Sequence, residues 1–270
     1  MSITQNKTTL RVALVGASGA MGQEIQRLAS AAGAEVVLRF DAEHPLPELL
    51  PEVPVDVAID FTLPHVVGGN IMTIMGWGLP LVVGTTGWLS ELDKVTEAVK
   101  ESGGKLIWAS NFSIGVQAFF RIVRQAAELM EHLHDYDVAL HEEHHLRKAD
   151  SPSGTARTLG EILLAALSRK KEVLTETSHG RISPEALHIT SRRLGTIPGT
   201  HTVTFDSGAD TIELVHRARN RSGFALGALL AAEWIHTAPP GFYCFDEIFE
   251  QIIHPQEKDL DTQPNSIGKE

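Results

Sequence analysis

Three side chains that can donate or accept a proton lie close together near the middle of the chain, at His144, His145 and Lys148. They are followed at once by Ser153, Gly154 and Thr155, small residues of the kind that begin a helix. The free N–H groups of a helix start bind a carboxylate, and a neighbouring lysine or histidine can supply a proton during a reaction. The segment therefore predicts acid–base chemistry on an anionic substrate.

The same histidines are also candidates for metal ligands, because His141, His144 and His145 are closely spaced. No cysteine joins them, their spacing differs from the H-E-x-x-H pattern, and Lys148 would repel a cation. We therefore expect no metal here. A solvated loop without chemistry is the other alternative that the residues alone leave open.

A glycine-rich turn follows the first apolar run of the chain, Leu10 to Val15. Its sequence is Gly16, Ala17, Ser18, Gly19, Ala20, Met21 and Gly22. Such a turn lets the backbone approach a pyrophosphate, which the N-terminus of the next helix then stabilises. The spacing G-x-x-G-x-x-G is not the commoner G-x-G-x-x-G, so an ordinary turn is the alternative. The position at the first strand–helix junction favours a dinucleotide site.

The residue expected to bind the adenine ribose lies about 20 positions beyond such a turn, at the end of the second strand. Asp41 occupies this place. Arg39 could contact a 2′-phosphate or could point away along the strand, so the sequence leaves NADH and NADPH both open.

Two later strand ends carry small and amide-bearing residues that suit a ribose and a nicotinamide carboxamide. They are Gly84, Thr85 and Thr86 after one apolar run, and Ala109, Ser110, Asn111 and Phe112 after another. Ligands bind at the carboxyl ends of strands in open α/β sheets. We expect both segments to contact the cofactor, although each alone is more often a simple turn.

Short apolar runs alternate with helical segments over the first hundred residues, which predicts an α/β fold with a Rossmann-type, doubly wound parallel sheet. The expected strands are Leu10–Val15, Glu35–Phe40, Val55–Phe61, Leu81–Val83 and Leu106–Trp108. Helices are expected over Ala20–Ala32 and from an N-cap at Ser90 to Gly103.

Beyond Phe112 the pattern predicts an α+β domain with an open sheet, mixed or mostly antiparallel. The expected helices are Ile114–Leu133, Thr155–Arg169 and Phe224–Ile235, and the expected strands are Tyr136–Glu142, Leu187–Arg192, Thr200–Phe205 and Ile212–Arg217. The last helix returns to the first domain. We therefore expect residues 1–112 and 222–270 to form the dinucleotide-binding domain, and residues 113–221 to form the domain for substrate binding and oligomerisation. The polar tail from Pro255 is expected to be loose.

Composition narrows the class of protein. A chain of 270 residues can build two cores, and its formal net charge of −11 argues against nucleic acid as a partner. The single cysteine, Cys244, excludes an intrachain disulfide and fits a reducing compartment. No run reaches the roughly 18 apolar residues of a membrane span, and the polar first residues lack a signal peptide. We expect a cytoplasmic protein without a membrane partner.

The segment from Glu142 to Ala156, EEHHLRKADSPSGTA, resembles the signature of the dihydrodipicolinate reductase family. Further motifs of that family appear in the same order: the glycine turn, Gly84–Gly87, Asn111–Ser113, Arg193–Gly195, Gly199–Thr202 and the segment Arg219–Gly227. The resemblance covers most of the chain and is weakest between Glu43 and Pro54 and after His254.

The resemblance implies an oxidoreductase that reduces 4-hydroxy-tetrahydrodipicolinate with NADH or NADPH, with loss of water, in the diaminopimelate route to lysine. His144 would donate or accept the proton, Lys148 would protonate the substrate, and His145, Gly154 and Thr155 would bind the cyclic dicarboxylate. The segments Gly16–Met21, Asp41, Gly84–Thr86 and Ala109–Phe112 would hold the cofactor. The family is generally a homotetramer joined through its C-terminal-domain sheets.

Two competing functions remain to be weighed. Another two-domain dehydrogenase, acting on an aspartate-derived aldehyde or a different cyclic imine, is disfavoured by the joined His-His-x-x-Lys and Ser-Gly-Thr sequences and by the lack of a catalytic cysteine. A nucleotide sensor without activity is disfavoured because it would not need the proton donors His144 and Lys148.

Overall fold

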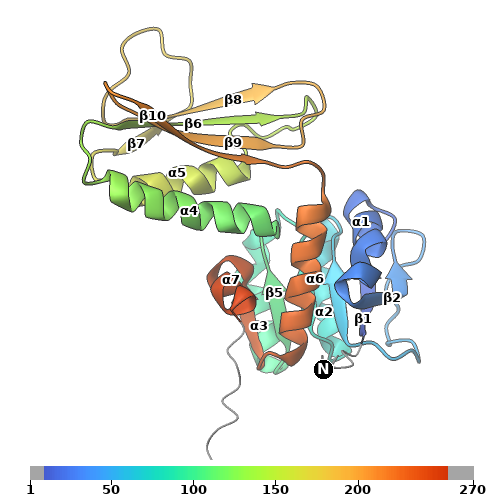
Figure 1. Ribbon diagram of the computed structural model, residues 1–270. Helices are drawn as coiled ribbons and strands as arrows, with labels where there is room; N and C mark the ends of the chain where they lie inside the picture. Colours follow the sequence, from blue (N-terminus) through green and yellow to red (C-terminus); the bar gives the residue numbers. More distant parts are fainter. Residues whose placement is uncertain (1–8, 255–270) are drawn as a thin grey trace, which may run out of the picture.

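This computed structural model describes residues 9–254. Their strands form two β-sheets, and helices pack against each sheet (Figure 1). The first sheet has six strands in the order β11-β5-β4-β3-β1-β2, and all its pairs are parallel. Its strands are β1 (Leu10–Val15), β2 (Ala34–Phe40), β3 (Val57–Asp60), β4 (Leu81–Val83), β5 (Lys105–Trp108) and β11 (Gly241–Cys244). Every residue of β3 and β4 is buried, as expected for parallel strands with both faces covered.

Helices cover both faces of this sheet, which confirms the doubly wound architecture. One apolar cluster joins the sheet to α1 (Ala20–Ala29), α6 (Ser222–Thr237) and α7 (Phe245–Ile253). A second cluster joins the other face to α2 (Pro64–Gly76) and α3 (Leu92–Glu101). The strand alternation explains this division, because Val12 and Leu14 belong to the first cluster whereas Ala13 and Val15 belong to the second.

The second sheet has five strands in the order β10-β9-β6-β8-β7. The strands are β6 (Asp137–His144), β7 (Glu172–Leu174), β8 (Ala186–Arg193), β9 (Thr200–Asp206) and β10 (Thr211–Arg217). Two of the four pairs are antiparallel and two are parallel, which confirms the mixed sheet of the two expected alternatives. The cause is helix α5 (Gly154–Ala166), which connects β6 to strands that lie parallel to it.

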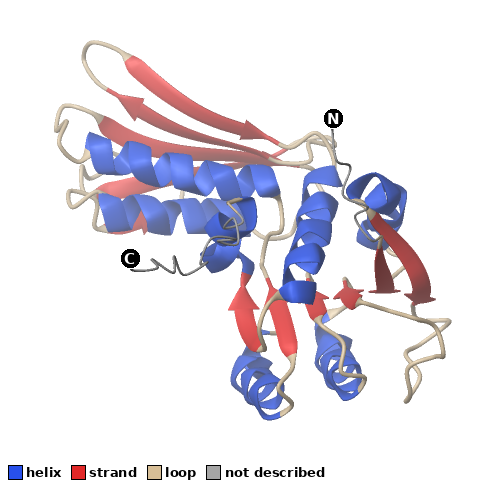
Figure 2. Ribbon diagram, turned by 60° about the horizontal axis from the view of Figure 1, so that its bottom comes forward, coloured by secondary structure: helices blue, strands red, loops and turns tan. Residues whose placement is uncertain are grey.

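One face of the second sheet is covered by α5 and by α4 (Ile114–Met130), which lie side by side (Figure 2). Alternate residues of β6, such as Val138 and Leu140, pack against these helices in a third apolar cluster. Within residues 9–254 no helix covers the opposite face of this sheet (Figure 1). Among the described residues, the second sheet therefore has one face covered by helices and one face without them.

Several expected boundaries were wrong. Ser90 is not an N-cap: it lies inside a 3₁₀ turn, Leu89–Glu91, which the buried Trp88 anchors by donating from Nε1 to Thr85 O. Strand β6 continues two residues beyond Glu142, so His144 ends a strand and does not begin a loop. The sequence reading did not anticipate α2, β7, β11 and α7. The tail from Pro255 lies outside the described residues.

None of the helices in the described part of the chain has the length and apolar character needed to cross a bilayer.

Candidate active site

The two groups of predicted site residues meet at the carboxyl ends of the first sheet. Asn111, in the loop after β5, donates a hydrogen bond from Nδ2 to Oγ1 of Thr155 on the first turn of α5, at 3.1 Å. A residue expected at the cofactor and one expected at the substrate are therefore in direct contact. This contact places the histidine-lysine segment beside the edge where a dinucleotide would bind.

The three predicted proton carriers differ in their surroundings. His144 is buried, with 8% of its surface exposed, and His145 is half-buried with no hydrogen-bond partner for Nδ1 among the described residues. The Lys148 ammonium lies 2.7 Å from Oδ1 of Asp150. Lys148 is thus paired with a carboxylate that is itself exposed.

Helix α5 begins as predicted, with Ser153 as its N-cap. The Ser153 hydroxyl accepts from the Ala156 N–H at 3.2 Å, which satisfies one of the free donors of the first turn. The exposed Gly154 N–H reaches Oδ2 of Asp150 at 3.3 Å. The Asp150 carboxylate thus bridges Lys148 and the helix start, the two groups expected to hold a substrate carboxylate.

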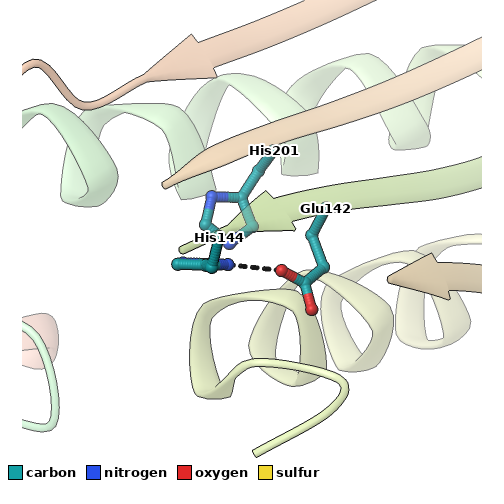
Figure 3. A group of neighbouring side chains, drawn as sticks. All are labelled: Glu142, His144 and His201. Carbon is teal, nitrogen blue, oxygen red and sulfur yellow. Dashed lines mark hydrogen bonds and ion pairs between the residues drawn. The ribbon is translucent and has the colours of Figure 1, made fainter. Parts of the chain in front are cut away.

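A buried polar cluster lies behind these residues (Figure 3). Glu142 is fully buried and accepts a short hydrogen bond from Nδ1 of His144. Arg193 donates to both oxygens of Glu142, at 2.8 and 3.1 Å. His201 approaches from β9, with its Nε2 3.0 Å from Oγ of Ser153 and its ring centroid 5.2 Å from that of His144.

The charges in this cluster follow from burial and pairing. Burial disfavours an ionised Glu142, but hydrogen bonds from His144 and Arg193 outweigh it and hold the pKa of Glu142 below its usual value. Burial, assisted by the nearby His144, lowers the pKa of His201 to about 3, so His201 is neutral near pH 7. The cluster therefore contains an ionised Glu142 beside a neutral His201.

Metal binding is not favoured by this arrangement, although ligand atoms of Glu142, His144 and His201 all lie within 4.8 Å of one another. Arg193 occupies both oxygens of Glu142 with a positive group, which opposes a cation there. His141, part of the metal alternative, contacts Thr190 Oγ1 on the opposite face of β6. The donor set fits a hydrogen-bond network better than a metal site.

The predicted phosphate turn has the backbone that a dinucleotide requires. Gly16 has a φ of +83°, and a Cβ at this position would lie 2.3 Å from the Phe61 carbonyl oxygen, so only glycine fits. Gly19, the N-cap of α1, has no side chain to cap the helix, which leaves N–H groups of its first turn available to an anion. Ser18, Gly19 and Ala20 are exposed. The residues present fit a pyrophosphate.

Asp41 lies beside this turn, as predicted for a ribose-binding residue. Its carboxylate accepts from the backbone N–H groups of His44 and Glu43 at 3.0 Å and also contacts the Ser18 hydroxyl. The bond from the His44 backbone is the largest of these effects, and together they lower the pKa of Asp41. Arg39 is exposed and donates to Gln26 Oε1, whose amide in turn donates to Ala17 O.

The later strand ends contribute fewer side chains than expected. Thr85 is buried, and its hydroxyl accepts from the Thr62 N–H at 2.7 Å and donates to Asp60 at 2.9 Å. Ala109 is buried too, and the buried Phe112 ring packs against Phe245. These residues can offer only backbone groups to a cofactor. The exposed Thr86 and Ser110, with Gly84 and Asn111, remain the accessible members.

Asp60 is a residue of this edge that the sequence reading did not single out. It is fully buried and accepts from Thr62, Thr85 and Asn70, so it ties the ends of β3 and β4 to α2. Burial raises the pKa of Asp60 against the effect of these bonds. An acidic residue inside an otherwise apolar strand was the indication available in the sequence.

Glu142, Arg193 and His201 appeared in the sequence only as members of motifs. Residues two apart on a strand share a face. Had the expected strand been extended from Glu142 to His144, it would have placed these two side chains together. Arg193 and His201 come from strands whose register no local pattern fixes.

Two surface hollows, of about 270 and 330 Å³, lie at the opposite end of the first sheet. They are lined by residues such as Gly103 and Gly241 in one case and Gly33 and Asp56 in the other. Neither contains a predicted site residue.

Comparison with known proteins gives a consistent result. The family models described as "Dihydrodipicolinate reductase, N-terminus" and "Dihydrodipicolinate reductase, C-terminus" match residues 10–112 and 115–249. A 4-hydroxy-tetrahydrodipicolinate reductase of Christiangramia forsetii is 40% identical, over 84% of this chain and 92% of that protein. One from Archaeoglobus fulgidus is 36% identical, over 89% of this chain and all of that protein.

Solved structures agree with this result. Dipicolinate-bound dihydrodipicolinate reductase from Paenisporosarcina sp. TG-14 superposes with a TM-score of 0.68 at 26% identity, over 89% of this chain and 99% of that chain. An engineered D-amino acid dehydrogenase bound to NADP+ shares the fold, with a TM-score of 0.52 at 14% identity.

Proposed function

Because the chain belongs to the dihydrodipicolinate reductase family, we infer that it is an oxidoreductase that reduces 4-hydroxy-tetrahydrodipicolinate to tetrahydrodipicolinate, with loss of water. The reaction belongs to diaminopimelate and lysine biosynthesis. A nicotinamide dinucleotide is the reductant. The contact between Asn111 and Thr155 is the single observation that carries this function, because it joins the cofactor edge to the acid–base segment.

Substrate binding is assigned to the start of α5 and the residues around it. The N–H groups of Gly154 and Thr155, the Ser153 turn and His145 lie where a carboxylate of a cyclic dicarboxylate can be held. The dipicolinate bound to the Paenisporosarcina enzyme is a ligand of this class. Asp150 contacts both Lys148 and Gly154, the donors proposed for the substrate, so a substrate carboxylate at these donors would displace Asp150.

Proton transfer is assigned to Lys148 and His144. The bound nicotinamide supplies the hydride, and the protein positions the reactants and moves the proton. Reduction at ring C4 leaves an enamine-like anion that is protonated at C3, and the Lys148 ammonium is the acid beside it. Its charge also stabilises the dicarboxylate. His144 donates or accepts a proton with it.

Both nicotinamide cofactors are proposed to serve, with weak discrimination. The Asp41 carboxylate suits the ribose hydroxyl groups of NADH and repels the 2′-phosphate of NADPH. The exposed Arg39 is linked to the glycine turn by Gln26, which accepts from Arg39 and donates to Ala17 O. We propose that the positive charge of Arg39 offsets part of the repulsion between Asp41 and the 2′-phosphate. The segment Gly16–Met21 holds the pyrophosphate, and Gly84–Thr86 with Ala109–Phe112 holds the nicotinamide end.

At the level of the molecule, we propose that residues 1–112 and 222–270 bind the dinucleotide and that residues 113–221 bind the substrate and oligomerise. We propose a cytoplasmic homotetramer, as the family resemblance implies. The uncovered face of the second sheet supports association between copies, because a sheet face is normally covered. Native mass spectrometry measures this directly, and a monomer at working concentration would contradict the tetramer.

The function is tested by following nucleotide absorbance after adding 4-hydroxy-tetrahydrodipicolinate made in situ by the preceding synthase reaction. We expect oxidation of NADH and NADPH that depends on this substrate. Aspartate-derived aldehydes serve as control substrates for the alternative dehydrogenase. Turnover of the aldehyde alone, or nucleotide binding without any turnover, would contradict the proposal.

A further inference from the structure

Among the described residues, His144 has a hydrogen-bond partner for one of its ring nitrogens, Nδ1. Glu142 lies two residues earlier on β6, and both side chains face the helix-covered side of the sheet. An ionised carboxylate can only accept hydrogen bonds, so Nδ1 carries its proton in both the neutral and the charged imidazole. The proton that His144 can exchange is therefore the one on Nε2.

The Glu142 carboxylate is itself fixed by three hydrogen bonds from two residues. Arg193, from β8, donates Nη2 to Oε1 at 2.8 Å and Nη1 to Oε2 at 3.1 Å. The backbone N–H of Ser153 donates to Oε1 at 3.2 Å. These donors keep Glu142 ionised despite its complete burial, and they prevent it from rotating away from His144.

The Nε2 side of His144 is kept open by the absence of a side chain at Gly199. A Cβ built on Gly199 would lie 2.9 Å from His144 Nε2, and Gly199 has a φ of +151°, which residues with side chains rarely adopt. The imidazole therefore has space only because this position is glycine.

Titratable or charged groups on each packed element lie in or beside the cluster around His144. Glu142 on β6 bonds His144, Arg193 on β8 bonds Glu142, and the His201 ring on β9 packs against that of His144. His216 on β10 and Lys148, which is paired with Asp150, act electrostatically on His201. His201 is neutral near pH 7 because burial lowers its pKa to about 3, and burial also lowers the pKa of His216. Glu142 is thus the group that sets the tautomer of His144.

We propose that Glu142 is a positioning residue: it fixes the Nδ1–H tautomer of His144 and so leaves Nε2 to exchange the proton of the reaction, while Arg193 maintains Glu142 as an acceptor. The proposal rests on the function proposed above, because that function gives His144 its part in proton transfer.

The test compares three variants with the wild type. Glu142→Gln removes the charge and turns an amide N–H₂ group toward Nδ1, which favours the opposite tautomer of His144. Glu142→Asp keeps the charge. Glu161→Gln, at an exposed position on α5, removes the same charge far from the cluster and serves as the control.

We expect Glu142→Gln to lower kcat by about 10²-fold, the scale of acid–base catalysis, with KM little changed. Glu142→Asp recovers part of kcat, and Glu161→Gln behaves as the wild type. Circular dichroism and NADH affinity show whether each variant is folded.

Nitrogen-15 NMR of labelled histidines reads the tautomer independently of activity. The expected result is a protonated Nδ1 on neutral His144 in the wild type and a protonated Nε2 in Glu142→Gln. An unprotonated Nδ1 in the wild type overturns the proposal even if the variant does not fold, and so does wild-type kcat in a folded Glu142→Gln. His144→Ala distinguishes failure of the Glu142 proposal from failure of the proposed function. Wild-type turnover in His144→Ala contradicts the role of His144 in proton transfer itself.

Discussion

At the residue scale, the proposed role of Lys148 as a proton donor can be tested by a single substitution. Its ammonium contacts Asp150, and among the described residues it makes no hydrogen bond to the phosphate turn or to the buried Glu142 cluster. Lys148→Ala should therefore leave folding and cofactor affinity nearly intact while kcat falls by at least about 10²-fold. Steady-state kinetics and NADH titration measure both quantities. Turnover like that of the wild type would remove Lys148 from the mechanism.

Asp41 decides cofactor choice on the same scale. Asp41→Ala removes both the acceptor for the ribose hydroxyl groups and the charge that repels a 2′-phosphate. We expect kcat/KM to fall with NADH and to rise with NADPH, so that the ratio shifts toward NADPH. Measurement of kcat/KM with each cofactor, in wild type and variant, checks this. An unchanged ratio would show that Asp41 does not read the ribose.

At the element scale, the ends of β3 and β4 depend on the buried Asp60. Burial raises its pKa, so the folded protein binds this proton more tightly than the unfolded chain. The contribution of Asp60 to stability is complete below the unfolded pKa of about 4 and is lost as the pH rises through the folded pKa. Asp60→Asn does not titrate and can keep the bonds to Thr62 and Thr85.

The variant Asp60→Asn should therefore gain free energy of unfolding relative to the wild type as the pH rises from about 4 toward neutrality. Denaturant unfolding at a series of pH values measures the difference, with NADH affinity as a check on the strand ends. A difference in the free energy of unfolding that does not change with pH would show that burial does not raise the pKa of Asp60.

The elements also show what a sequence can and cannot predict. The apolar runs of the first sheet were evident because parallel buried strands have no polar alternation, and β1 and β4 were placed to the residue. Helix α2 was missed because apolar residues surround it on most sides and glycines interrupt it. Strand β11 was missed because its partner is β5, more than a hundred residues away.

The site divides in the same way. Local motifs singled out the glycine turn and the segment from His144 to Thr155 because each lies at a strand–helix junction, and they singled out Asp41 because it follows the second strand. The partners of Glu142 could not be predicted locally, since Arg193 and His201 reach it through strand pairing. The buried roles of Thr85 and Phe112 depend on tertiary packing too.

At the scale of the whole molecule, the two sheets are joined by loops at 109–113 and 218–221 and by a contact between α4 and α7. Gln117 bonds Asp246, and Arg121 pairs with Glu250. The small residues Ser113 and Gly223 lie at the two connections and can absorb a rotation. We expect the two parts to close on binding cofactor and a dicarboxylate together, since hydride transfer requires both reactants in contact.

Small-angle scattering checks this closure. The radius of gyration should decrease with both NADH and dipicolinate present, and should change less with either one alone. Identical curves in all four conditions would indicate a site that is already formed without ligands.

The most direct test of the whole account is a structure of the ternary complex with a nicotinamide cofactor and dipicolinate. We expect the nicotinamide at the strand ends beside Asn111, with its C4 atom about 3–3.5 Å from the ligand ring. One ligand carboxylate should replace Asp150 at the Gly154 N–H and at Lys148. A dicarboxylate bound away from the start of α5, or a nicotinamide out of reach of the ligand ring in every copy, would contradict the account.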